Sequence, residues 1–222
     1  MFEVVSSPST GGSALFATAH IAMGSLILSE TSITPKSPSS SPRRYIDAYE
    51  SLLPEVKSQY DKLNGSSCCR ETMIEEAKAL SADNFEAHLV GRVNAFEGGL
   101  IFPTGSFFNH SCDCNVAFSC SDVVGSWRAL TDIPSGAELT ISYLGVDVLA
   151  GKSRRRERLL REKFFVCACA RCEAAEDKAT MLPCPGCHPR VGRYSQDSSC
   201  TFHPRRADSR HTAQRQQRRR QR

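Results

Sequence analysis

The stretch Phe-Phe-Asn-His-Ser-Cys-Asp-Cys-Asn, residues 107–115, runs from an apolar pair straight into two amides, an imidazole and two thiols. A plain core strand needs none of these polar groups, but the stretch alone does not say what they do. Two later segments make it informative: Gly-Ala-Glu-Leu-Thr-Ile-Ser-Tyr at residues 136–143, and Cys-Ala-Cys-Ala-Arg-Cys at residues 167–172. Together the three segments gather amide, imidazole, thiol and phenol groups in one part of the chain.

Length and composition are those of an ordinary globular protein. The 222 residues suffice for one domain with an appended piece, and 40% of them are hydrophobic and 23% charged. There is no apolar run of about 18 residues, so no transmembrane helix is expected. Residues 1–5 lack the basic and apolar pattern of a signal peptide. We expect a soluble protein of the nucleus, the cytoplasm or both, with no membrane partner.

The net charge of +4 hides an asymmetry along the chain. Residues 205–222 contain eight Arg and one Asp, a balance of +7; without them 20 basic and 23 acidic residues remain, or −3. The low complexity of the C-terminal residues predicts a disordered tail. Any binding of nucleic acid therefore depends on this tail alone. The simpler interpretation is a solvated tail without a partner.

Hydrophobic patterning predicts short strands near residues 14–18 and 25–30, with a turn around Gly24. The simplest interpretation is an ordinary hairpin, and the alternative is a loop whose glycines approach a ligand. A Pro/Ser-rich loop and three apolar stripes at helical spacing then predict a helical insert over about residues 34–95. The first stripe ends at Pro54. Ser81 is the predicted cap of the third helix.

The chain between residues 100 and 145 predicts β structure. Short strands are expected at residues 116–119, 126–130 and 139–143, because β-branched and aromatic residues alternate there between turn signals. Residues 151–163 predict a basic helix in which the Arg run forms a solvated face.

The eleven cysteines favour metal binding over disulfides, because several lie two or three residues apart and no secretory signal is evident. Cys167, Cys169 and Cys172 place three thiols within six residues, too close for unstrained disulfides among themselves. A tetrahedral Zn²⁺ needs a fourth ligand. The spacing leaves Cys184, Cys112 and Cys114 as candidates. A second set in the tail, which resembles a small zinc ribbon in surroundings with almost no apolar residues, consists of Cys184, Cys187, Cys200 and His203.

Four segments in order resemble the SET-domain protein lysine methyltransferases, in particular the SMYD-like branch. Residues 12–17 resemble the first cofactor motif, residues 109–115 the Asn-His-Ser-Cys motif, residues 136–143 the segment that ends in the active-site tyrosine, and residues 165–172 the post-SET zinc segment. The resemblance spans roughly residues 10–173. It implies a mainly β fold with a helical insert (α+β), made of small curved sheets in which the two central motif segments thread together as a pseudoknot.

The resemblance also implies roles for individual residues. Tyr143 is the implied catalytic residue beside the transferred methyl group. The implied ligands of one structural Zn²⁺ are Cys112, Cys167, Cys169 and Cys172. The implied contacts of the methyl donor, S-adenosylmethionine, are Ser13, Ala14, Leu15, Asn94, Asn109, His110, Tyr143 and Phe165.

The sequence departs from the family pattern at three positions. Ala14 stands where the first motif usually has a second glycine, and Cys114 stands where the Asn-His-Ser-Cys motif usually continues with proline. Lys163 stands where the post-SET segment often has a tyrosine. A cation there opposes a protonated lysine substrate. The insert also lacks the paired Cys/His spacing of a MYND finger.

From these features we expect an S-adenosylmethionine-dependent protein lysine N-methyltransferase that acts on a lysine of a histone or another protein. A SET-fold interaction module with weak or no catalysis is the alternative, and a zinc-dependent nucleic-acid binder that uses the tail is a third. The expected domains are a SET domain at residues 1–150, a post-SET helix and zinc segment at 151–177, and the basic tail at 178–222.

Overall fold

The computed structural model describes residues 1–6, 12–36, 41–65, 69–175, 177, 182–183 and 193–194. The chain forms two compact units, Met1–Ala175 and Glu176–Arg222. In the second unit, β8 (Leu182–Pro183) pairs with β9 (Arg193–Tyr194) in antiparallel fashion. The predictions of a disordered tail and of a second metal set at Cys184, Cys187, Cys200 and His203 fall outside the described residues.

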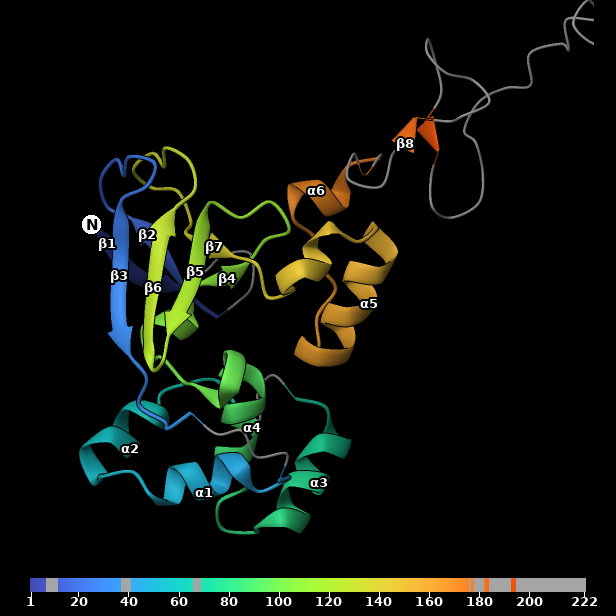
Figure 1. Ribbon diagram of the computed structural model, residues 1–222. Helices are drawn as coiled ribbons and strands as arrows, with labels where there is room; N and C mark the ends of the chain where they lie inside the picture. The colour runs from blue at the N-terminus through green and yellow to red at the C-terminus, as the bar shows by residue number, and fades with distance from the viewer. Residues whose placement is uncertain are drawn as a thin grey trace, which may run out of the picture. The chain divides into compact units, whose positions relative to one another are not determined.

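Three small sheets make up the β part of the first unit (Figure 1). β1 pairs with β2, the order β3-β6-β5 forms the second sheet, and β4 pairs with β7. The strand bounds are β1 Phe2–Ser6, β2 Ser13–Ala17, β3 Leu26–Thr31, β4 Asn109–His110, β5 Val116–Ser121, β6 Val124–Ala129 and β7 Thr140–Ile141.

The prediction that the strands near residues 14–18 and 25–30 form a hairpin is wrong. β2 pairs with β1, with Leu15 opposite Val4, whereas β3 pairs with β6 in another sheet. The connection between β2 and β3 explains the difference, because Ile21 is buried and exchanges both backbone hydrogen bonds with Ile133. Burial of Ile21 there leads the two strands into separate sheets. The turn at Gly24 is present, with a φ of 82°.

A short parallel pair brings the two central motif segments together. Asn109 lies opposite Thr140, and His110 lies opposite Ile141. The residues between these strands form the antiparallel pair β5–β6, so the two segments meet although about thirty residues separate them. This pairing holds the polar cluster of residues 109–115 beside the segment that ends in Tyr143.

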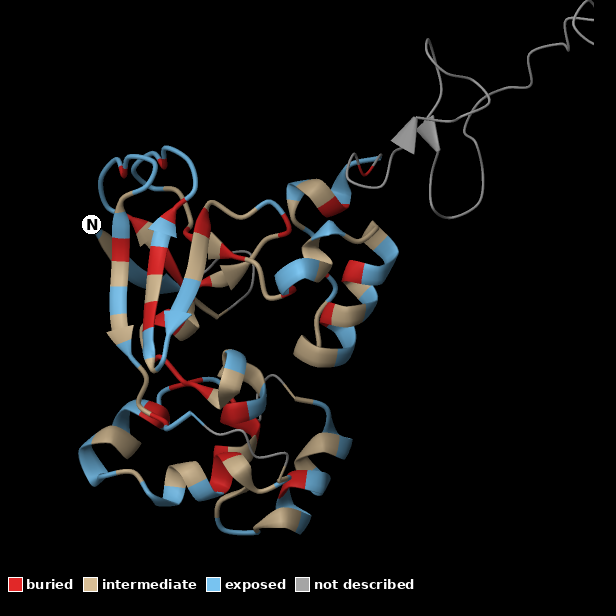
Figure 2. Cartoon of the chain, in the orientation of Figure 1, coloured by how far each residue is buried: buried red, intermediate tan, exposed pale blue. Residues whose placement is uncertain are grey.

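The main core surrounds Trp127, which is fully buried, and Figure 2 shows that buried residues recur along the strands of the sheets. The Trp127 ring stacks on Phe108 with centroids 5.6 Å apart, and it meets Phe118 at 4.9 Å. Gly105 and Gly125 lie against the same indole, and a Cβ at either position would come within 2.7 Å of a ring carbon. The aromatic packing therefore requires glycine at both positions, which fixes the segment leading into β4.

Helices cluster below the sheets in Figure 1. Their bounds are α1 Arg44–Glu50, α2 Pro54–Tyr60, α3 Glu71–Leu80 and α4 Phe85–Asn94. Pro54 begins α2, a position where its missing N–H costs nothing. Ser81 is not the residue before α4; its Oγ accepts the backbone N–H of Asn84 instead. One buried cluster of this part contains Tyr60, Leu63, Ala87, Val90 and Ile101.

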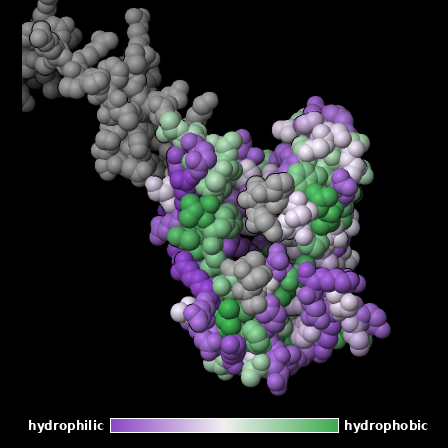
Figure 3. Space-filling view, turned by 180° about the vertical axis from the view of Figure 1, so that it is seen from behind, coloured by the Kyte–Doolittle hydropathy of each residue, from purple (hydrophilic) through white to green (hydrophobic). Residues whose placement is uncertain are grey.

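The chain after β7 continues through η4 (Gly145–Leu149), α5 (Lys152–Lys163) and α6 (Ala170–Glu173), and two further short turns are η2 (Glu97–Gly99) and η3 (Gly105–Phe107). Within the described part of the chain, none of the helices has the length and apolar character to span a membrane. The face shown in Figure 3 mixes hydrophilic residues with separate small hydrophobic areas.

Candidate functional site

Four cysteine sulfurs converge at one point. Cys112 Sγ lies 3.5 Å from Cys172 Sγ and 3.9 Å from Cys167 Sγ, and with Cys169 all four sulfurs lie within 4.8 Å of one another. A tetrahedron with Zn–S bonds of ~2.3 Å has sulfurs about 3.8 Å apart. The spacing and the all-thiol donor set therefore fit a structural Zn²⁺. Of the three candidates for the fourth ligand, the structure brings Cys112 to this position.

The local fold explains how these sulfurs meet. Cys112 lies two residues after β4. Cys167 and Cys169 lie between α5 and α6, and Cys172 lies within α6, where its N–H donates to Cys169 O. Burial raises the pKa of the Cys112 thiol and that of Cys167, the latter to about 11. Burial acts in the same direction on Cys169, but backbone hydrogen bonds from Cys112 and Cys172 lower its pKa to about 7. A metal would hold all four as thiolates.

Arg155 is the functional residue that the sequence did not indicate. The run of arginines that contains Arg155 was predicted to form a solvated face, yet Arg155 is fully buried. Its Nε donates to Cys112 Sγ at 3.2 Å, Nη2 donates to Cys172 Sγ at 3.4 Å, and Nη1 donates to Ala150 O at 2.6 Å. Four thiolates around Zn²⁺ carry a net charge of −2, so a buried guanidinium bonded to two sulfurs offsets part of that charge.

Replacement of Arg155 by Met is expected to weaken zinc binding by about 10- to 100-fold, in line with the effect of outer groups at other metal sites. Met fills a similar volume but leaves the thiolate charge uncompensated. Competition against a chromophoric chelator measures the change. Arg154→Met, at an exposed position of the same helix, is the control and should leave the affinity unchanged. Equal affinities of the two variants would contradict the role given to Arg155.

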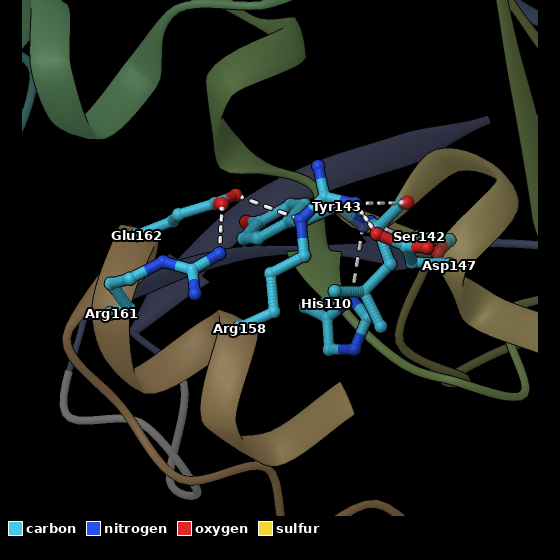
Figure 4. Close-up of polar contacts among 8 residues, drawn as sticks. His110, Ser142, Tyr143, Asp147, Arg158, Arg161 and Glu162 are labelled. Atoms are coloured by element: carbon cyan, nitrogen blue, oxygen red, sulfur yellow. Dashed lines mark hydrogen bonds and ion pairs between the residues drawn. The ribbon is translucent and has the colours of Figure 1, made fainter. Parts of the chain in front are cut away.

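His110 connects the sulfur cluster with Tyr143, and Figure 4 shows its contact with Tyr143. Its Nδ1 accepts the backbone N–H of Tyr143 at 3.0 Å, and its Nε2 lies 3.3 Å from Cys112 Sγ. Burial, together with the charge of Arg155, lowers the pKa of His110 to about 4, so the ring is neutral at pH 7. Because Nδ1 accepts, Nε2 carries the proton and points it at the sulfur.

Asn109 and Asn115 join the two central segments through their amide side chains. Asn109 Nδ2 donates to Glu138 Oε1 at 2.8 Å. Asn115 Nδ2 donates to Glu138 O, and its Oδ1 accepts the Thr140 N–H, both at 2.8 Å. These bonds explain the two amides of the opening stretch, because they fix β4 against the strand that leads to Tyr143.

The Tyr143 hydroxyl donates to Phe108 O at 2.7 Å. Burial, with the negative charge of Glu138 as a smaller contribution, raises the pKa of this phenol, which therefore stays neutral. The hydroxyl has used its only proton, so its oxygen offers lone pairs to any donor that approaches.

Two aromatic rings accompany Tyr143. Phe165 has its centroid 6.0 Å from that of His110 and 6.5 Å from that of Tyr143, in an edge arrangement with the latter. Phe165 is placed there because Phe164 adopts a left-handed φ of 65° and ends α5. The rings of His110, Tyr143 and Phe165 form a neutral aromatic surface next to the sulfur cluster.

The end of α5 is held by polar contacts that the sequence did not predict. Arg158 is paired with Asp147 and donates to Glu162 at 2.9 Å, as the dashed lines in Figure 4 show. It also donates to Leu144 O. These contacts tie α5 to the turn that follows Tyr143 and so fix the distance between Tyr143 and Phe165.

The remaining predicted contact residues lie in two places. Asn94 ends α4, where its Nδ2 donates to Asn64 O and Val90 O, and the neighbouring Val93 O accepts Lys163 Nζ. Ser13, Ala14 and Leu15 lie in β2, and the last two are fully buried. Leu15 O accepts the N–H of Leu139, so β2 runs beside the segment that carries Glu138. That these residues contact a cofactor stays a prediction.

Comparison with known proteins gives a consistent result. A family model of the SET domain matches residues 12–144. Histone-lysine N-methyltransferase SMYD3 of Mus musculus is 36% identical over 122 residues, which cover 49% of this chain and 28% of that protein. N-lysine methyltransferase SMYD2 of Homo sapiens is 36% identical over 85 residues, which cover 38% of this chain and 19% of that protein. The chain thus spans less than a third of the length of these relatives.

Solved structures agree on the fold. Rubisco LSMT bound to sinefungin and monomethyllysine has a TM-score of 0.51 at 14% identity, covering 75% of this chain and 52% of that chain. The SET domain of LSMT bound to lysine and AdoHcy has a TM-score of 0.50 at 14% identity, with the same coverage. The fold predicted from the sequence, small sheets with a helical part, is confirmed.

Proposed function

This chain belongs to the SET-domain family, with relatives in the SMYD branch, and on this premise we propose that it is a protein lysine N-methyltransferase that uses S-adenosylmethionine. The observation that carries the proposal is the position of Tyr143: its hydroxyl donates to Phe108 O, and its ring lies beside His110 and Phe165. The relatives named above are lysine methyltransferases, and the LSMT structures contain AdoHcy or sinefungin with a lysine.

The side chains around Tyr143 suit a sulfonium donor. A sulfonium carries positive charge, and aromatic faces attract cations. His110 and Tyr143 are both neutral, and Phe165 adds a third ring. We infer that the donor is held by these rings together with Ser13, Ala14, Leu15, Asn94 and Asn109. When bound, it supplies a methyl group on a sulfur that leaves readily.

The chain itself orients and desolvates the acceptor amine. The lone pairs of Tyr143 Oη accept an N–H of the amine, since the phenol proton is committed to Phe108 O. Burial of the amine next to the positively charged sulfonium disfavours the ammonium form and lowers the pKa of a lysine from its usual ~10.4. Alignment of amine and methyl at about 3–3.5 Å then supplies much of the rate.

A SET-fold interaction module without catalysis remains the second candidate, because Lys163 places an amine 5.4 Å from the centre of the Tyr143 ring. Ala14 gives the interaction module less support than Lys163 does. It lies in β2 opposite Val5 without a positive φ, so the strand accommodates its methyl group.

The decisive experiment measures cofactor binding by calorimetry and then label transfer from S-adenosylmethionine to histones and to proteins of a cell extract. We expect binding near one donor per chain and label on protein lysine. Binding without any label on protein would favour the interaction module. Absence of both binding and label would exclude the proposal.

We further propose that the protein acts in the nucleus or cytoplasm, because clustered thiols are kept reduced in these compartments. Its partner is a protein that presents a target lysine. Nucleic acid binds, if anywhere, to residues 178–222. We propose that the chain is divided into a SET domain at residues 1–150, a post-SET segment at 151–177 and a tail at 178–222. Deletion of residues 178–222 tests the tail, since loss of a steeply salt-dependent affinity would assign nucleic-acid binding to it.

A further inference from the structure

Lys163 directs its amine into the candidate site. It is the last residue of α5, and the left-handed Phe164 turns the chain away directly after it. The Lys163 Nζ lies over the Tyr143 ring, 5.4 Å from its centroid. The same nitrogen donates to Val93 O at 2.7 Å, beside Asn94. The amine is therefore held at both sides, against the aromatic ring and against the end of α4.

The surroundings of this amine make its neutral form more accessible than that of an ordinary lysine. Burial lowers the pKa of Lys163 to about 8; the charge of Arg92 acts in the same direction, and that of Glu162 opposes it. The third titratable group that faces it, Tyr143, is neutral. Within the described ranges, no carboxylate lies within ion-pair distance of Nζ, because Glu162 is bonded to Arg158 and Arg161 instead. A lysine amine in this state is a nucleophile near physiological pH.

We propose that Lys163 is itself a methyl acceptor, modified by its own chain at the site of Tyr143. The inference rests on the proposed function, since it requires the same donor. It adds Lys163 as a modification site. The amine of Lys163 is already buried against the Tyr143 ring, and an aromatic face tolerates both ammonium and methylated ammonium.

The step is a simple displacement. The lone pair of neutral Lys163 Nζ forms the new N–C bond while the C–S bond of the sulfonium breaks, so S-adenosylmethionine leaves as neutral S-adenosylhomocysteine. The methylated nitrogen then carries the positive charge, and it releases a proton to water. The hydrogen bond to Val93 O uses one N–H only, so the lone pair of the neutral amine stays available.

The test uses the full chain with S-adenosylmethionine and no other protein. Intact mass spectrometry should show a gain of one methylene unit, and peptide mapping should place it on Lys163. Lys163→Arg should abolish the gain, because Arg keeps the charge but does not accept the methyl group. Lys152→Arg is the matched control: this lysine begins the same helix, donates to Ala174 O, and should not matter.

Two kinetic readouts separate modification within the chain from other events. The rate constant should not change with protein concentration. It should also rise about tenfold per pH unit below about 8 and level off above it, because only the neutral amine reacts and the pKa of Lys163 is lowered to about 8.

Three outcomes would overturn the inference. These are a rate constant that grows with protein concentration, methyl groups spread evenly over several lysines, and methylation of histone or extract proteins while Lys163 stays unmodified. In the last case the proposed function stands and only the internal acceptor fails. If calorimetry shows that the chain does not bind the donor at all, the proposed function fails as well.

Discussion

Replacement of Tyr143 by Phe should lower kcat/KM for methyl transfer by about 10²- to 10³-fold, equivalent to about 3–4 kcal/mol of transition-state stabilisation. The ring and its packing against His110 and Phe165 remain. Only the oxygen that orients the amine is lost, and with it the hydrogen bond to Phe108 O. Steady-state kinetics with labelled donor and a protein substrate measure the change, and calorimetry should show donor binding close to that of the unaltered protein.

Tyr60→Phe is the matched control. Tyr60 is buried among the helices, and its hydroxyl donates to the backbone carbonyl of Ala87 at 2.8 Å. Each variant therefore leaves one buried carbonyl without its phenol partner, at a cost of about 1–3 kcal/mol in the free energy of unfolding. We expect the two variants to lose equal stability, and only Tyr143→Phe to lose activity. If both variants lose activity in proportion to stability, Tyr143 has no chemical role.

Replacement of Cys112 by Ser should remove the zinc and loosen the segment from Phe164 to Ala174. Structural Zn²⁺ contributes about 10–16 kcal/mol in small zinc domains, so the loss of one of four thiolates far exceeds that of an ordinary buried contact. Elemental analysis should show the metal content falling from near one per chain to near zero. Hydrogen exchange should show lost amide protection around α6, while β5 and β6 stay protected because the Trp127 core does not depend on the metal.

Cys120→Ser is the control for this variant. Cys120 is an exposed thiol at the end of β5 and is not one of the four clustered sulfurs. It should keep both the metal and the exchange pattern. A well-folded Cys112→Ser protein that retains one zinc per chain, or an unaltered protein that is purified without zinc, would refute the assignment of the metal site.

The parts of this protein that sequence reasoning predicted are those carried by motif chemistry. Cys167, Cys169 and Cys172 predict a metal because three such close thiols have few other uses, and Cys112 completes the set. Strand positions were predicted to within a few residues where the pattern is clear, as at β5.

The predictions that failed have a common cause: the sequence does not show which distant segments of the chain pack against each other. The strand at β2 carries no local sign that it pairs with β1 rather than β3; burial of Ile21 against Ile133 decides that. Arg155 is one of three consecutive arginines, and its spacing of four residues from Leu159 places it on the buried face of α5, but spacing does not show what it contacts. Only the fold places it against two sulfurs, because the position of α5 over Cys112 is set by tertiary contacts.

The sulfur cluster joins residues that lie 60 positions apart, from Cys112 to Cys172. During translation at ~5–20 residues per second, the ribosome delivers Cys172 about 3–12 s after Cys112. A nascent chain that has not reached Cys172 therefore lacks both the metal and the correctly seated Phe165. The sulfur cluster is therefore completed only after Cys172 has been synthesised, and from that point zinc would hold the segment that carries Phe165 beside Tyr143.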